Sequence, residues 1–240
     1  MTTPVSDSKW PKEIPALTAE QMEISDDWMK YFHEVNRTKF SGVVGFNHRY
    51  VAQHSPGGFL STLDVGAGLG EHLQYESLGP EQLQNYAALE IRPEMADTIR
   101  ENWPTVVVHG FDCQKTMPFA DGAFDRIIAI HVLEHLPDLP AFLREARRLL
   151  RKGTGRLLVV IPCEGGSGYT LGRKFTSKRM FEARYDVPYE PFIAVEHVNQ
   201  AREVLEELKA LFCVEHRSFY PLLVPLVDIN LCIGLTLRPL

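Results

Sequence analysis

Three glycines at alternate positions follow a short apolar run, and they restrict the fold of this chain more than any other feature. The run at 60–65 leads directly into Gly66, Gly68 and Gly70. Glycines at a strand-to-helix turn allow the backbone to approach a ligand closely. We therefore predict a cofactor loop at the first βα turn of a doubly wound α/β sheet.

The spacing and charge of this loop discriminate between two classes of cofactor. The dinucleotide fingerprint GxGxxG would require a third glycine at position 71, where the chain has Glu71. Asp64 and Glu71 flank the loop, and two carboxylates are unfavourable beside a pyrophosphate at a helix N-terminus. The same acids suit a positively charged ligand. The pattern therefore favours S-adenosylmethionine, which carries an ammonium and a sulfonium but no phosphate, over a nicotinamide dinucleotide.

From residue 60 onward, short apolar runs alternate with helical periods, which is typical of a parallel sheet with crossover helices. The clearest helical pattern spans 138–151, where Asp138 can cap the helix, and another helix is predicted at 200–211. The expected fold class is α/β, a Rossmann-like doubly wound sheet of about seven strands. It is mostly parallel, with an antiparallel C-terminal pair and helical cap elements. The predicted strands lie at 60–65, 86–91, 105–109, 125–130, 156–161, 213–220 and 229–237.

We expect one domain preceded by a flexible arm. The chain has 240 residues, of which 45% are hydrophobic and 23% charged, a globular composition that excludes a disordered or fibrous chain. Thr18 and Gln21 have capping-box spacing, so the first helix is expected to begin near Thr18. The expected divisions are a flexible arm (1–17) and a single domain (18–240), made of a cofactor-binding core (58–162), an acceptor-side cap insertion (163–199) and a C-terminal helix and strand pair (200–240).

Several segments together resemble the class I S-adenosylmethionine-dependent methyltransferases that act on small molecules. They are the glycine loop, Glu90 after the second strand, Asp112 after the third, and the stretch 117–138 around the fourth. The resemblance implies that Glu90 accepts hydrogen bonds from both ribose hydroxyls and that Asp112 meets the adenine amino group. The cofactor site that it implies consists of Asp64, Gly66, Gly68, Gly70, Glu90, Ile91, Asp112, Cys113 and His131.

The segment containing His131, Glu134 and His135 has three interpretations. The spacing matches the inverted zinc-peptidase signature, but that site needs one continuous helix, for which Pro137 leaves little room. The segment is also similar to the ExxEH site with which ubiquinone-pathway O-methyltransferases and small-RNA end methyltransferases hold a divalent metal. With a histidine at the first position, magnesium is disfavoured and a transition metal favoured, and His197 could add a ligand. The third interpretation is capping and hydrogen bonding, so a divalent metal stays possible but uncommitted.

The catalytic residues are expected at the carboxyl ends of the strands, where ligands of open parallel sheets bind. This places His131 beside the transferred methyl group. Methyl transfer is an in-line displacement, so positioning of the acceptor is the main catalytic task. A hydroxyl acceptor would also need a general base, and histidine can take a proton near neutral pH. We expect His131 and His197 to be the catalytic residues, and Cys163 to be a buried cysteine rather than a nucleophile.

The cap insertion is predicted to contact the methyl acceptor. It begins with a glycine-rich hinge after Pro162 and carries five basic residues with one acid among them. These residues either recognise a phosphate on the acceptor or form a solvated helix face. As a further alternative, the insertion and the apolar stretch 221–227 together form a membrane-surface contact or a homodimer interface. The insertion and the N-terminal helix are expected to close as a lid over the acceptor and the cofactor. The basic residues of the insertion are Arg173, Lys174, Lys178, Arg179 and Arg184.

Charge and cysteine content indicate the compartment and the class of partner. The formal net charge of -6 opposes binding to duplex nucleic acid, and four cysteines without a CxxC pair suit a reducing compartment. The first thirty residues contain no secretory apolar region, and no apolar run could cross a bilayer. We expect a cytoplasmic methyltransferase for an oxygen, or as second choice a nitrogen, of a small molecule such as a sugar or secondary metabolite. The alternatives are an NAD(P)-dependent oxidoreductase, disfavoured because no Tyr-x-x-x-Lys pair is present, and a non-catalytic S-adenosylmethionine-binding protein.

Overall fold

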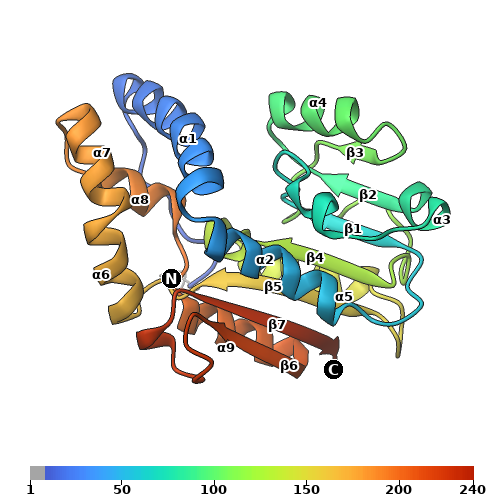
Figure 1. Ribbon diagram of the computed structural model, residues 1–240. Coiled ribbons are helices and arrows are strands. Elements are labelled where there is room, and N and C mark those ends of the chain that lie inside the picture. The colour runs from blue at the N-terminus through green and yellow to red at the C-terminus, as the bar shows by residue number, and fades with distance from the viewer. Residues whose placement is uncertain (1–8) are drawn as a thin grey trace, which may run out of the picture.

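The computed structural model describes residues 9–240, apart from the side chains of residues 33 and 36–39. A seven-stranded sheet in the order β3-β2-β1-β4-β5-β7-β6 forms its centre (Figure 1). The strands from β1 to β5 are mutually parallel, and β7 pairs antiparallel with both β5 and β6. This topology confirms the predicted fold class. The strands are β1 (Thr62–Val65), β2 (Tyr86–Leu89), β3 (Val107–His109), β4 (Arg126–Ile130), β5 (Arg156–Pro162), β6 (Phe212–Tyr220) and β7 (Cys232–Pro239).

Helices cover both faces of the sheet, as the nearly continuous burial of its central strands requires. On one face, α2 packs its Val51 against Ile128 of β4. On the other face, Ile127 of the same strand lies in one apolar cluster with α5 and α9, because successive side chains of a strand point to opposite faces. These helices are α2 (Ser41–His54), α5 (Leu139–Leu149) and α9 (Ala201–Leu211), with α3 (Pro80–Gln84) and α4 (Pro93–Asn102) near the β2 and β3 edge (Figure 1).

A helical cap lies beyond the carboxyl ends of β4 and β5 (Figure 1). It combines α1 (Ala19–Lys39) with three helices from the segment 163–199. Trp28 of α1 is buried against the edges of the Phe181 and Tyr189 rings, with centroid distances of 5.1 Å and 6.3 Å. The N-terminal helix and the cap insertion therefore form one aromatic unit. The inserted helices are α6 (Ser167–Phe175), α7 (Ser177–Tyr185) and α8 (Glu190–Glu196).

The predicted capping residues have the expected hydrogen bonds. The Gln21 N–H donates to Thr18 Oγ1 at 3.2 Å, and the Thr18 N–H donates to Gln21 Oε1 at 2.9 Å. These reciprocal bonds satisfy two backbone donors at the start of α1. At α5, the Ala141 N–H donates to Asp138 Oδ1 at 3.1 Å. Both helix starts thus follow from local side-chain chemistry.

Two residues of the predicted arm, Trp10 and Lys12, contact α9 and the segment before it. The Lys12 ammonium donates to Glu203 at 2.8 Å and to the Val198 carbonyl at 2.8 Å. The Trp10 indole N–H donates to Glu207 at 3.2 Å. Residues 9–17 form neither a helix nor a strand, but side chains that look polar and solvated in sequence find partners 186 to 197 positions away. Residues 1–8 of the predicted arm lie outside the described residues.

This attachment should make the stability of the fold depend on acidic pH. Burial raises the pKa of the Glu203 carboxyl, but donors from Lys12, the Gln200 N–H and Lys9 outweigh burial and lower it to about 2. Because the folded pKa is below the ordinary value of 4.5, the stabilisation is present above pH 4.5 and is lost as the pH falls towards 2. We expect Glu203→Gln to cost about 1 kcal/mol in urea unfolding at pH 7 and progressively less at lower pH.

The exposed Glu206, on the same helix, provides the matched control. Glu206→Gln should leave the free energy of unfolding within about 0.5 kcal/mol of the parent at every pH. An equal effect of the two substitutions at pH 7 would contradict the assigned ion pairs.

Within residues 9–240, no helix combines the length and the hydropathy that a membrane span requires.

Candidate active site

The glycine loop follows β1 and folds back over the end of β2. The N–H groups of Gly66 and Ala67 both donate to the Leu89 carbonyl, at 2.8 Å and 3.1 Å. Gly66, Gly68 and Gly70 have φ angles of +65°, +59° and +80°, a region that residues with a Cβ atom rarely adopt. A Cβ atom on Gly66 would lie 2.6 Å from Val132 Cγ2. The loop therefore needs glycine both for its backbone conformation and for its contact with the segment after β4.

Glu90 is held directly beneath this loop. Its Oε2 accepts the Gly68 N–H at 2.9 Å, and its Oε1 accepts the Arg92 N–H at 3.0 Å. The side chain is only 3% exposed, so few conformations are open to it. Oε1 also accepts the Arg92 Nε–H at 3.4 Å, a long bond that a ligand hydroxyl could replace, and Oε2 can accept a second hydrogen bond. The arrangement thus provides an oriented pair of acceptors at the carboxyl end of β2.

The acids that were expected to flank the loop occupy different environments. Asp64 is buried below the loop, where its Oδ2 accepts the Tyr86 hydroxyl at 2.7 Å. Burial raises the pKa of this carboxyl above its ordinary value. Glu71 accepts the Leu69 N–H at 3.0 Å and supports the loop itself. The expected acidic rim is therefore wrong for Asp64, because this strand residue points into the protein.

The residues after β2 and β3 differ in exposure. Ile91 is 67% exposed beside Glu90, so its side chain is available to a ligand. The Asp112 carboxylate accepts the Gln114 N–H at 2.9 Å and remains partly exposed. Cys113 is buried, and burial together with the charge of Asp112 raises its thiol pKa to about 12. Ile91 and Asp112 thus have exposed side chains, whereas Cys113 is buried; their contacts with the cofactor stay a prediction.

His131 immediately follows β4 and has a left-handed backbone, with φ of +53°. Such a conformation is strained for a residue with a Cβ atom, and it is often found at functional sites. Its Nδ1 lies 3.1 Å from Glu134 Oε1, and its Nε2 lies 2.7 Å from Asn47 Nδ2. Burial lowers the pKa of His131, but the contacts with Cys232 and Glu134 outweigh burial and raise it. Both ring nitrogens of the expected base are therefore already in contact with protein groups.

Glu134, His135 and His197 converge at the boundary between the core and the cap. One ligand atom of each lies within 4.8 Å of the others. The Glu134 side chain is 2% exposed, whereas the His135 and His197 side chains are 34% and 16% exposed. Burial raises the pKa of Glu134, but the His131 hydrogen bond and the nearby imidazoles lower it to about 2. The short 3₁₀ helix η2 (Leu133–His135) excludes the long helix of an inverted zinc peptidase.

Comparison with known proteins identifies a methyltransferase domain within the chain. Residues 63–159 match the sequence model described as a methyltransferase domain. Malonyl-[acyl-carrier protein] O-methyltransferase from Erwinia pyrifoliae is 31% identical over 122 residues, which are 49% of this chain and 43% of that protein. The chain covers less than half of the length of each of the three curated relatives.

Solved structures share the fold at low sequence identity. The PH0226 protein from Pyrococcus horikoshii superposes with a TM-score of 0.60 and 16% identity, covering 86% of this chain and 93% of that chain. The N-methyltransferase NodS from Bradyrhizobium japonicum, in complex with S-adenosylhomocysteine, superposes with a TM-score of 0.56 and 14% identity. The match covers 86% of this chain and 90% of that chain. Residues 63–159 therefore contain a methyltransferase domain, and the chain has the fold of class I S-adenosylmethionine-dependent methyltransferases.

The residues of this methyltransferase domain fit the family's cofactor. The Glu90 carboxylate is oriented by the Gly68 and Arg92 N–H groups, and its contact with the ribose hydroxyls stays a prediction. Cβ atoms on the three loop glycines would lie 2.6 to 3.4 Å from protein atoms, so the loop packs closely on its surroundings. Ile91 provides an exposed apolar side chain beside it. Val65 is in register with Leu89 and with Ala129, so Glu90 and His131 follow on either side of the loop. Glu90, His131 and the loop glycines are therefore brought to one edge of the sheet, whereas Asp64 is buried below the loop.

Three residues near the site were not identified from sequence. Asn47 contacts His131 from α2, Cys232 lies 4.0 Å from the same ring on β7, and Glu164 contacts His197 at 2.7 Å. Glu164 directly follows Cys163, so its position after β5 was a usable signal. The sequence around Asn47 and Cys232 contains no such signal, because each is a single residue in an ordinary segment far from His131 in the chain.

Cys163 and the basic residues of the cap can now be assigned environments. Cys163 is fully buried, and burial raises its thiol pKa to about 12, which supports a packing role. Three of the five basic residues are in ion pairs with carboxylates of this chain, so a phosphate would have to compete with these carboxylates. The pairs are Arg173 with Glu164, Lys178 with Glu190, and Arg184 with Asp27. Recognition of phosphate stays a prediction.

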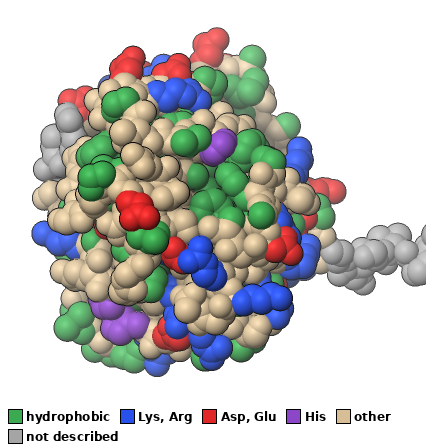
Figure 2. All heavy atoms as spheres, turned by 90° about the vertical axis from the view of Figure 1, so that its right-hand side faces the viewer, with side chains coloured by type: hydrophobic (Ala, Val, Ile, Leu, Met, Phe, Trp, Pro, Cys, Tyr) green, Lys and Arg blue, Asp and Glu red, His purple; other side chains and the backbone are tan. Residues whose placement is uncertain are grey.

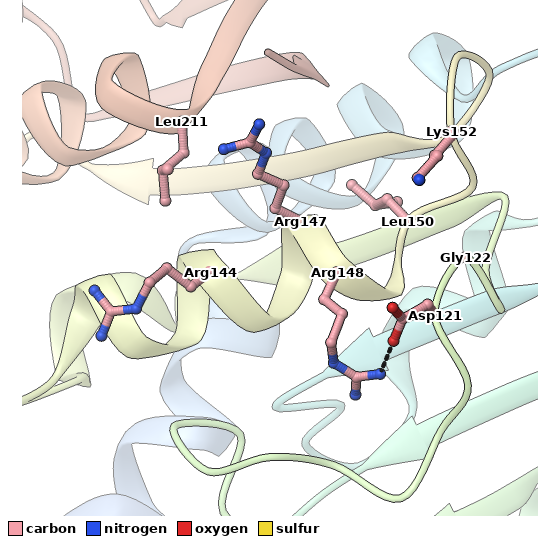
Figure 3. A pocket seen from close by; sticks show the side chains of 8 residues that line it. All are labelled: Asp121, Gly122, Arg144, Arg147, Arg148, Leu150, Lys152 and Leu211. Carbon is pink, nitrogen blue, oxygen red and sulfur yellow. Dashed lines mark hydrogen bonds and ion pairs between the residues drawn. The ribbon is translucent and has the colours of Figure 1, made fainter.

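A separate basic pocket of about 590 Å³ lies far from the glycine loop in the topology (Figure 3). Arg144 and Arg147 of α5 line it together with Lys152, and Arg148 contacts Asp121 at 2.6 Å. The loops that contribute to it precede β4 and β5, at the amino ends of these strands. The face at this end of the sheet has basic side chains gathered toward its lower right (Figure 2). None of the predicted site residues lines this pocket.

Proposed function

We propose that this chain transfers a methyl group from S-adenosylmethionine to an oxygen of a small molecule. The observation that carries the proposal is the arrangement around Gly66, with the anchored Glu90 carboxylate on one side and His131 on the other. This arrangement lies at the carboxyl ends of parallel strands, where such folds bind ligands. The cofactor would supply an electrophilic methyl group, and the protein would orient the acceptor towards it.

The groups on the acceptor side support oxygen as the acceptor atom. A hydroxyl must lose a proton during methyl transfer, and a positioned imidazole can accept it. His197 contacts Glu164 through Nδ1 at 2.7 Å, which orients the ring and leaves Nε2 without a partner among the described residues. His131 has contacts at both nitrogens, so it is better suited to position Glu134 and the acceptor.

The similar proteins do not select the acceptor atom. The Erwinia relative is named as an O-methyltransferase, and NodS is named as an N-methyltransferase. The preference for oxygen therefore depends on the histidine and carboxylate groups of this chain. Nitrogen is the second candidate, because a neutral amine can react without a base.

Mass spectrometry of reaction products tests the proposed function. The chain is incubated with isotopically labelled S-adenosylmethionine and a pool of small hydroxylated and aminated metabolites. We expect a product that has gained one labelled CH₂ unit, and NMR should place the new methyl group on oxygen. A product methylated on nitrogen would overturn the choice of acceptor atom, and absence of any labelled product would favour a non-catalytic cofactor-binding protein.

Calorimetric titration addresses the oxidoreductase alternative. S-adenosylhomocysteine should bind the chain, and NADH should give no heat of binding at the same concentrations. The physical reason is that the loop has GxGxG spacing and lies against the buried carboxylate of Glu90. Binding of NADH without binding of S-adenosylhomocysteine would reverse the assignment.

A further inference from the structure

We propose that Glu134, His135 and His197 form a binding site for one divalent transition-metal ion of the class that includes Zn²⁺ and Co²⁺. The three side chains bring one ligand atom each to within 4.8 Å of the others. The proposal concerns metal binding and stands whether or not the chain methylates an oxygen.

The fold fixes the distance between the two parts of this cluster. Glu134 and His135 follow β4, whereas His197 ends the last cap helix. The buried Asn199 connects them: its N–H donates to the Glu134 carbonyl at 3.0 Å, and its Nδ2 donates to the Leu133 and Leu136 carbonyls, both at 2.8 Å. Three hydrogen bonds from one fully buried side chain and its backbone therefore hold the cap segment against η2. The cluster does not depend on a chance approach of surface side chains.

Glu134 has an unsatisfied acceptor inside the protein. Its Oε1 lies 3.1 Å from His131 Nδ1, but its Oε2 has no hydrogen-bond partner in the described part of the chain. The residue is 1% exposed, so solvent does not solvate that oxygen freely. A buried carboxylate oxygen without a partner is costly, and a cation would remove this cost.

Both histidines have an outer carboxylate on one ring nitrogen. His197 Nδ1 lies 2.7 Å from Glu164 Oε2, and Glu164 is itself held by Arg173 at 2.5 Å. His135 Nδ1 lies 3.6 Å from Glu196 Oε2, while its Nε2 lies 3.9 Å from Glu134 Oε1. Carboxylates that accept the second N–H of a ligating histidine fix the ring and raise its basicity. Glu164 is at hydrogen-bond distance from His197, whereas Glu196 is only at ion-pair distance from His135; in both rings Nε2 is available as a ligand.

The donor set selects the class of metal. Two neutral imidazole nitrogens and one carboxylate oxygen suit Zn²⁺, Co²⁺ and related ions, whereas Mg²⁺ prefers oxygen ligands. Three protein ligands also leave at least one coordination position for water or another oxygen ligand. The partial exposure of His135, 34% for its side chain, allows such a ligand to reach the site.

Titration of the chelator-treated full-length chain with Co²⁺ tests the proposal. We expect one ion per chain and a visible absorption spectrum with nitrogen ligation, and Zn²⁺ should displace Co²⁺. His197→Ala and His135→Ala should each weaken Co²⁺ binding by at least about 100-fold, since each removes one of three ligands. Glu164→Gln should weaken it by about 10- to 100-fold while the stoichiometry stays at one, because it removes only an outer partner.

His216→Ala is the matched control, since His216 lies on β6 and stacks on His54. It should leave Co²⁺ affinity unchanged. The proposal is overturned if no stoichiometric ion binds, if the two ligand variants bind Co²⁺ as the parent does, or if Mg²⁺ binds more tightly than Co²⁺. Circular dichroism shows which variants are folded, and either histidine variant suffices for the decision if the other does not fold.

The outcome is separable from that of the proposed function. S-adenosylhomocysteine should bind equally well to the metal-free and metal-loaded chain, because Glu90 and the glycine loop are not part of the cluster. If metal binds, His197 is a ligand rather than a free base; coordination to the ion would then lower the pKa of the acceptor hydroxyl, and its proton would pass to water. If metal does not bind, methyl transfer can still be demonstrated from labelled products.

Discussion

Gly66→Ala is expected to lower the free energy of unfolding by about 2–5 kcal/mol, because two costs combine at this position. The first is conformational, since φ is +65° and a left-handed backbone disfavours any residue with a Cβ atom. The second is steric, since the new Cβ would lie 2.6 Å from Val132 Cγ2. Urea unfolding followed by circular dichroism measures the loss, and weaker binding of S-adenosylhomocysteine should accompany it.

Two companion variants separate these costs. Gly153 also has a positive φ, of +81°, but a Cβ there meets no heavy atom within 4 Å. Gly153→Ala should therefore show only the conformational cost of about 1–2 kcal/mol. When Val132 is already alanine, Gly66→Ala should lower the free energy of unfolding by an amount closer to this conformational cost alone. If Gly66→Ala costs no more than Gly153→Ala, the close contact between the loop and Val132 is wrong.

Glu90→Ala should weaken binding of S-adenosylhomocysteine by about 1–3 kcal/mol, or about 5- to 150-fold in Kd. The carboxylate is anchored by the Gly68 and Arg92 N–H groups, so the ligand meets acceptors that are already oriented. Removing them loses charge-assisted hydrogen bonds to the ribose and also frees the Gly68 N–H. Isothermal titration calorimetry on the folded variant gives the change in Kd directly.

Glu94, an exposed residue in the first turn of α4, provides a matched control. Glu94→Ala removes a carboxylate of equal charge four residues away, and its affinity for S-adenosylhomocysteine should equal that of the parent. Glu90→Gln should lie between the parent and Glu90→Ala, because its amide keeps one acceptor. Unchanged affinity in folded Glu90→Ala would remove the ribose assignment without affecting the fold.

The sheet could be predicted because its strands are short, apolar and bounded by turns. The strand expected at 156–161 is Arg156–Pro162, and the antiparallel C-terminal pair is where the pattern placed it. The third strand is shorter than predicted, Val107–His109, because it lies at the edge of the sheet and pairs on one side only. Helix α2 was not predicted, and its interior glycines and histidines give it only a weak apolar stripe.

Some residues of the candidate site could be predicted from the local sequence, whereas others depend on contacts between distant segments. Glu90 and His131 were found because each directly follows a strand, and the topology of a parallel sheet fixes where such residues lie. The direction of the Asp64 side chain was not predictable, because strand alternation alone does not say which face holds a buried partner such as Tyr86. The contact between His131 and Asn47 spans 84 residues and depends on how α2 packs.

The aromatic core of the cap has a consequence for how this fold could diverge. Among the described residues, the cluster built on Trp28 and Phe181 has no member in common with the three clusters that stabilise the sheet. Substitutions that reshape the acceptor side therefore leave the packing beneath the glycine loop intact. Because Tyr169 of α6 packs against the main cluster of the sheet, α1, α7 and α8 are the helices that could be rebuilt together while the half of the molecule that holds the glycine loop is inherited unchanged.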